Sequence, residues 1–131
     1  MTSKELMELA KEARQNAYCK YSNFYVGAAL LARSGKIYLG CNIENASFTP
    51  TNCAERTAFF SAIAAGEREF EAIAVCGAKN DIPPTVCMPC GVCRQVMAEF
   101  CSQDFPVYVM GENEKINKFT LGELLPSAFN I

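Results

Sequence analysis

The segment FYVGAALLARSGKIYLGCN, residues 24–42, decides how the fold begins. Phe24 to Ala32 is an apolar run of strand length, and Lys36 to Asn42 is a second candidate strand. The dipeptide Ser34-Gly35 supplies a turn between them. Because so short a connection suits neighbouring strands that run in opposite directions, the segment predicts an antiparallel hairpin.

Helical and strand patterns continue on both sides of this hairpin. Residues 3–18 have apolar side chains at helical spacing, with Thr2 or Ser3 available as the N-cap. The later segments predict a helix over 53–65 that ends at Gly66, a strand over 70–78, a proline-containing loop over 80–89, a helix over 90–101, a strand over 105–110 and a short helix over 120–125. Strands that alternate with helices in this way predict a layered α/β sandwich around a mixed sheet.

Length and charge narrow the class of protein. The chain has 131 residues, which we interpret as one domain spanning 1–131. Its net charge is −2 and no segment carries a basic run, which argues against a nucleic-acid polymer as partner. No apolar stretch approaches the roughly 18 residues of a membrane span, and residues 1–5 lack the apolar centre of a signal peptide. We therefore expect a cytoplasmic protein.

Cysteine is abundant and histidine is absent. The chain has eight cysteines, which in a reducing compartment point to metal binding or catalysis rather than to disulfides. With no histidine, any metal site here lacks imidazole ligands, and any catalytic base is another residue type. We expect Cys19, Cys41, Cys76 and Cys101 to act as small buried hydrophobic residues.

Two short motifs place cysteines at predicted helix starts. Pro89-Cys90-Gly91-Val92-Cys93-Arg94-Gln95 opens one helix and Thr51-Asn52-Cys53-Ala54-Glu55-Arg56 opens another. The partial positive charge of a helix N-terminus favours thiolates, so these cysteines can bind one metal ion together. Three protein ligands leave a fourth position open, which is typical of catalytic zinc, and the nearby Glu55 carboxylate could then act on a water there.

Other interpretations of these cysteines stay open from the spacing alone. Cys87 also stands three positions before Cys90, so Cys53, Cys87, Cys90 and Cys93 could form a closed, structural zinc site in a module that binds partners. Alternatively, Cys90 and Cys93 could be a redox dithiol that uses no metal.

Together the motifs resemble the cytidine deaminase family. The resemblance rests on Cys-Ala-Glu-Arg at 53–56 followed by Pro-Cys-Gly-x-Cys-Arg-Gln at 89–95, and it extends to segments 21–30, 40–48 and 123–129. It implies a three-layer sandwich, with a mixed five-stranded sheet and helices on both faces. It also implies zinc-dependent hydrolysis of cytidine and deoxycytidine to uridine and deoxyuridine plus ammonia, as in pyrimidine salvage. The three-cysteine members are typically homotetramers whose sites are shared between subunits.

The resemblance also implies a role for each matching residue. Cys53, Cys90 and Cys93 would hold one Zn²⁺, Glu55 would move protons between water and the base, and Arg56 would draw charge from the thiolates. The expected substrate contacts are a ring stacked on the pyrimidine (Phe24), groups that bind the ribose hydroxyls (Asn42 and Glu44), the backbone of Ala54, the carbonyl of Met88, and two aromatic residues from neighbouring subunits (Phe48 and Phe129).

Two positions depart from the pattern of many relatives. Phe48 stands where many have tyrosine, and Met88 stands where many have serine or threonine. Both departures bear on affinity or substrate range rather than on the metal. A related enzymatic hypothesis is deamination of another aminopyrimidine nucleoside, such as the antibiotic blasticidin S, although residues 42–46 favour the plain nucleoside.

Overall fold

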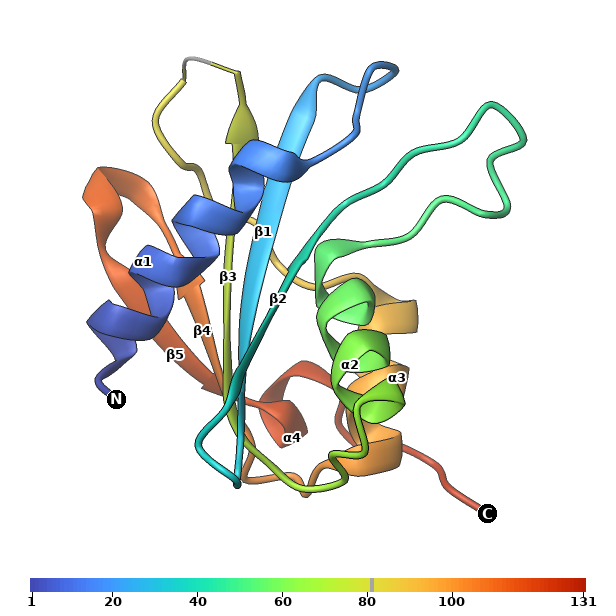
Figure 1. The fold of residues 1–131 in the computed structure, drawn as a ribbon. Helices are drawn as coiled ribbons and strands as arrows, with labels where there is room; N and C mark the ends of the chain where they lie inside the picture. The colour runs from blue at the N-terminus through green and yellow to red at the C-terminus, as the bar shows by residue number, and fades with distance from the viewer. Residues whose placement is uncertain (81) are drawn as a thin grey trace.

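The computed structural model describes residues 1–80 and 82–131 and confirms the three-layer architecture (Figure 1). The elements in chain order are α1 (Ser3–Ala13), β1 (Phe24–Ala32), β2 (Ile37–Cys41), α2 (Ala54–Ala64), β3 (Phe70–Lys79), α3 (Gly91–Phe100), β4 (Pro106–Met110), β5 (Ile116–Thr120) and α4 (Leu121–Leu124). Two short 3₁₀ turns, η1 (Arg14–Asn16) and η2 (Glu112–Glu114), complete the set. Position 81, in the predicted loop 80–89, lies outside the described residues.

The sheet is mixed, as predicted. Its strand order is β2-β1-β3-β4-β5, and β3 and β4 are its parallel pair. The predicted hairpin is confirmed, because β1 pairs with β2 in antiparallel register from Gly27 opposite Cys41 to Leu31 opposite Ile37. Since parallel neighbours need a crossover, the chain passes from β3 through α3 before it forms β4.

Helices cover both faces of the sheet, and each face has its own apolar core (Figure 1). On one face α1 packs through residues such as Leu6 and Met7. On the other face α2 and α3 lie side by side, and the fully buried Phe59 meets the Phe70 ring edge-on at 5.1 Å. None of the described helices is long and apolar enough to cross a membrane.

The first helix is shorter than the predicted 3–18, although its start agrees with the prediction. Thr2 caps it, and the Thr2 side chain and Glu5 form a reciprocal capping box. The helix ends early because the chain at Tyr18 is extended and pairs elsewhere. The Tyr18 amide donates to the Asn42 carbonyl at 2.9 Å, and the Glu44 amide donates to the Tyr18 carbonyl at 2.7 Å. Tertiary pairing thus overrides the local helical pattern.

A glycine lets the start of α2 lie directly on the sheet. A Cβ atom at Gly40 of β2 would overlap the Ala54 carbonyl oxygen and would lie 2.5 Å from the Ala58 amide nitrogen. These are backbone atoms of α2, so only the absence of a side chain at this position permits the close approach. The contact fixes the first turn of α2, which carries Ala54 and Glu55 immediately after Cys53.

Candidate active site

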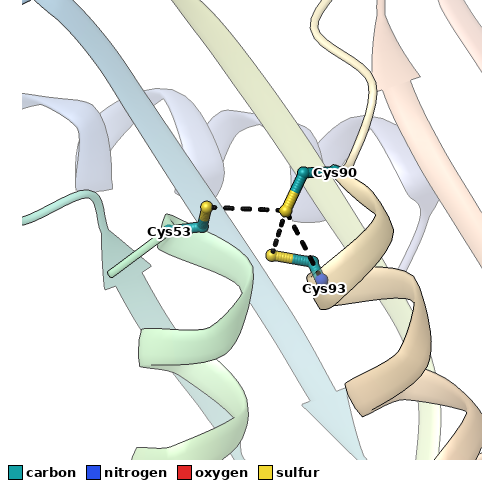
Figure 2. A group of neighbouring side chains, drawn as sticks. All are labelled: Cys53, Cys90 and Cys93. Atoms are coloured by element: carbon teal, nitrogen blue, oxygen red, sulfur yellow. Dashed lines mark hydrogen bonds between the residues drawn. The ribbon is translucent and has the colours of Figure 1, made fainter. Parts of the chain in front are cut away.

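Three cysteine side chains converge from the starts of two neighbouring helices (Figure 2). Cys53 is the N-cap of α2 and Cys90 is the N-cap of α3, while Cys93 lies in the first turn of α3. The Cys53 and Cys90 sulfurs are 3.8 Å apart, and those of Cys90 and Cys93 are 3.5 Å apart. All three sulfurs lie within 4.8 Å of one another, so the structure brings together the three predicted ligands.

This spacing fits one zinc ion. Sulfurs bound to a tetrahedral zinc at about 2.3 Å are separated from one another by about 3.8 Å. The measured separations of 3.8 and 3.5 Å match that value. Zinc accepts thiolates readily, and a set of three protein ligands leaves one position open for a small molecule.

Positive charge surrounds the thiols. Arg56 donates from Nη2 to the Cys53 sulfur at 3.2 Å, and the Cys93 backbone amide donates to the Cys90 sulfur at 3.5 Å. The pKa of Cys53 falls to about 5, because the Cys93 thiol and then the Arg56 guanidinium bind its thiolate. These contacts favour the thiolate at Cys53, the form that a metal requires, while the hydrogen bond with Cys53 and burial raise the pKa of Cys93. Arg56 also offsets the net charge of about −1 that Zn²⁺ and three thiolates would carry.

Glu55 is the buried carboxylate of this site. Its side chain lies in the first turn of α2 and is 4% exposed. Burial raises the pKa of Glu55 to about 7, since an apolar environment disfavours the charged form. A carboxyl group with such a pKa can both accept and donate a proton near neutral pH.

A pocket of about 320 Å³ is lined by Glu55 and by two of the three convergent cysteines, Cys53 and Cys90. It contains the predicted contact residues Phe24, Asn42, Glu44, Ala54 and Met88, together with further wall residues that include Ser22, Val26 and Cys87. Phe48 and Phe129 are not part of its wall and are 77% and 69% exposed. Within one chain, the structure therefore assembles the predicted site except for these two aromatic residues.

Asn42 and Glu44, two polar residues of the pocket wall, are held by hydrogen bonds that involve the backbone. The Asn42 side-chain oxygen accepts from the Val26 amide at 2.9 Å, and its nitrogen donates to the Phe24 carbonyl at 2.7 Å. Glu44 accepts hydrogen bonds from the Ser22 hydroxyl and from the Tyr21 and Ser22 amides, which lower its pKa. Ser22 is thus a site residue that sequence reasoning did not single out, and its place inside the matched segment 21–30 was the available signal.

Cys87 is not a fourth metal ligand. Among the described residues the cluster of convergent thiols has three members, and Cys87 instead forms part of the pocket wall. The structural-zinc hypothesis required four ligands and fails here. A simple Cys90–Cys93 dithiol is likewise disfavoured, because the Cys53 sulfur lies 3.8 Å from that of Cys90 as a third member of the cluster. Cys19 and Cys76 are buried as expected, whereas Cys41 and Cys101 are half-buried.

The fold and this site define a class, namely small α/β proteins that bind zinc through three cysteines and leave one coordination position open. Comparison with known proteins identifies the family. The family model for the "cytidine and deoxycytidylate deaminase zinc-binding region" matches residues 1–109. The chain belongs to this family.

Individual relatives agree with that assignment. A cytidine deaminase of Sporosarcina psychrophila is 51% identical over 99% of this chain and 93% of the relative. The crystal structure of a cytidine deaminase from Burkholderia pseudomallei has a TM-score of 0.90 and 50% identity, covering 98% of this chain and all (100%) of that one. A blasticidin-S deaminase of Bacillus cereus is more distant, at 32% identity over 93% of this chain and 88% of its own length.

Proposed function

We propose that this protein is a hydrolase that converts cytidine and deoxycytidine, with water, to uridine and deoxyuridine and ammonia. One observation carries the proposal: the buried Glu55 carboxylate lines a pocket of about 320 Å³ together with Cys53 and Cys90, two of the three convergent cysteines. The family match and the named relatives support the same reaction.

The protein's own residues hold the metal and move the protons. Cys53, Cys90 and Cys93 would hold one zinc ion, which would activate a water molecule by lowering its pKa to about 7. Glu55 accepts a proton from this water and donates one to N3 of the pyrimidine. The water oxygen forms a bond to C4 as N3 takes up this proton. Glu55 then carries the remaining proton of that oxygen to the exocyclic nitrogen, the bond from C4 to nitrogen breaks, and ammonia leaves while the oxygen remains on C4 as a carbonyl. Proton transfer of this kind contributes about 10² to 10⁴ in rate.

Other side chains orient the nucleoside. The Asn42 side chain accepts one hydrogen bond from the backbone of β1 and donates one to it. One lone pair of its oxygen and one N–H therefore remain for the sugar. Glu44 is fixed by Ser22 and Tyr21 and presents its remaining acceptor sites to a ribose hydroxyl. The Phe24 ring packs on the pyrimidine. The Ala54 backbone contacts the carbonyl of the base, and the Met88 carbonyl accepts a hydrogen bond from its amine.

We also propose that the active enzyme is a homotetramer. Phe48 is highly exposed and has a φ of 60°, a conformation that is costly for an aromatic residue and that is often found at functional positions. Phe129 is likewise exposed near the C-terminus. Each ring would complete the pocket of a neighbouring subunit. We place the single-domain enzyme in the cytoplasm and in pyrimidine salvage.

The direct test follows the ultraviolet absorbance of cytidine and of deoxycytidine mixed with purified protein whose zinc content has been measured. The proposal predicts loss of the cytidine spectrum, release of ammonia and about one zinc per chain. A protein that carries one zinc per chain and leaves both nucleosides unchanged would refute the assignment.

A second candidate substrate is an aminopyrimidine nucleoside with a larger sugar substituent. The similarity to a blasticidin-S deaminase favours including it. Blasticidin S should be tested in parallel with cytidine, and we expect cytidine to give the higher kcat/KM. A higher kcat/KM for blasticidin S than for cytidine would make blasticidin S the first candidate substrate.

A further inference from the structure

Gly77 has no side chain and so leaves a notch in β3, and this notch holds one wall of the pocket in place. Gly77 lies opposite Val26 in the pairing of β3 with β1. A Cβ atom at Gly77 would lie 2.7 Å from the Cys87 sulfur and 3.0 Å from Cε2 of Phe24. Cys87 and the Phe24 ring therefore occupy the space that a side chain at this position would need.

The backbone keeps Cys87 in that notch. The Thr85 amide donates to the Gly77 carbonyl at 3.2 Å, and these two residues form an isolated antiparallel bridge. The segment after Thr85 thus runs alongside the end of β3 and delivers Cys87 to Gly77. Cys87 and Phe24 both line the 320 Å³ pocket, so the notch sets how far this wall projects into it.

The orientation of the pyrimidine in the pocket, which rests on the proposed function, decides which atom of the base lies next to this wall. On a pyrimidine ring, N3 and C5 flank C4 on opposite sides. Glu55 exchanges a proton with N3 from the side of α2, so C5 faces away from α2. Among the residues that line the pocket, Cys87 and Met88 come from the segment that precedes α3 rather than from α2, and theirs is the wall that C5 would meet.

We propose that Cys87, seated in the notch at Gly77 beside Phe24, is a specificity-determining residue that limits the size of the substituent at C5 of the pyrimidine. Burial raises the pKa of the Cys87 thiol to about 12, so this wall stays uncharged at neutral pH. The limit is therefore steric. A hydrogen or a small atom at C5 fits beside the sulfur, whereas a methyl group competes with it for space.

The test compares kcat/KM for 5-methylcytidine with kcat/KM for cytidine, using zinc-loaded protein. Cys87→Ala removes the sulfur and makes room for about one methyl group, so the ratio should rise by about tenfold or more. Cys101→Ala is the matched control, because Cys101 is also a half-buried cysteine but lies outside the pocket wall. Its ratio should equal that of the parent.

A second pair of variants tests the notch itself. Gly77→Ala should push Cys87 or Phe24 into the pocket and lower the ratio below the parental value. Adding Cys87→Ala to Gly77→Ala removes the closest clash, so the double variant should have a ratio close to the parental value. Zinc content near one per chain shows that each variant is folded.

The outcomes separate this inference from the proposed function. If the parent deaminates cytidine but Cys87→Ala and Cys101→Ala give the same ratio, Cys87 does not limit the C5 substituent and the inference is wrong. If the zinc-loaded parent deaminates neither nucleoside, the proposed function fails and the inference fails with it.

Discussion

The two faces of the sheet use the same residue types for different purposes. On the α1 face, the buried Cys76 thiol packs against the Met110 sulfur at 3.9 Å and serves as core. On the α2 and α3 face, Cys53 and Cys90 cap helices and Cys93 lies one turn in, so their sulfurs meet. The comparison shows that position at a helix start, rather than cysteine itself, separates a metal ligand from a packing residue.

Charged groups differ between the faces in the same way. On the α1 face, Lys11 and Glu114 form an ion pair at 2.7 Å at the rim, where solvent screens it. On the opposite face the Glu55 carboxylate is buried, and among the described residues it is the one buried charged side chain. Burying a carboxylate costs stability, so its retention beside the thiols fits a functional role.

The largest expected contrast between the faces concerns the cysteines. Cys93→Ala should lose bound zinc and reduce deaminase activity to background, because two thiolates do not form a complete site. Cys76→Ala removes a comparable buried sulfur and should cost about 1 kcal/mol of stability while zinc stays near one per chain. Metal analysis and a denaturant titration measure both effects. Full zinc retention by Cys93→Ala would contradict the assignment of the metal ligands.

A pair of glycines gives the next contrast. The backbone of α2 packs on Gly40, and the end of α1 and the start of η1 pack on Gly27, where a Cβ atom would lie 2.6 Å from the Arg14 amide nitrogen. Alanine at either position should cost roughly 1–3 kcal/mol by overpacking. Only Gly40→Ala shifts the turn that carries Cys53 and Glu55, so only this variant should lower kcat and alter the visible spectrum of the cobalt-substituted protein. Equal kcat and spectra in both variants would show that Gly40 has no positioning role.

The smallest contrast concerns two exposed carboxylates. Hydrogen bonds from Ser22 lower the pKa of Glu44, and the Lys11 ammonium lowers that of Glu114, both from 4.5. A lowered folded-state pKa means stabilisation that is present above pH 4.5 and lost as the pH falls through the folded-state pKa. Each variant, Glu44→Gln and Glu114→Gln, should therefore differ from the parent in Tm at neutral pH, and this difference should shrink as the pH falls through the folded-state pKa. Only Glu44→Gln should also raise KM for cytidine; an unchanged KM would remove Glu44 from the sugar site.

Much of this organisation was predictable from local signals. The hairpin followed from the apolar runs flanking Ser34-Gly35, and cysteines at two helix starts indicated a metal site. The choice of Cys53, Cys90 and Cys93 as the three ligands came from the family resemblance. The strand β5 was not located along the chain, because its sequence INKFT places Asn117 and Lys118 at the centre of an edge strand and gives a weak apolar pattern. The family resemblance, rather than periodicity, supplied the count of five strands.

Other features depend on tertiary contacts that no local pattern encodes. The end of α1 is set by pairing of Tyr18 with the backbone at Asn42 and Glu44. The role of Cys87 was open because its spacing from Cys90 equals that of a ligand pair, and only the position of Gly77 shows why its sulfur lies in the pocket wall. The contribution of Phe48 and Phe129 to a site depends on neighbouring subunits, which remains a prediction.

The most direct measurement of the central claim compares the parent with Glu55→Gln, measuring cytidine turnover and bound zinc in the same samples. Glutamine keeps the size of the side chain but cannot carry protons. We predict about one zinc per chain in both proteins and a kcat lower by about 10² to 10⁴ in the variant. A zinc-loaded Glu55→Gln protein with the parental kcat would contradict the role of Glu55 as the proton carrier.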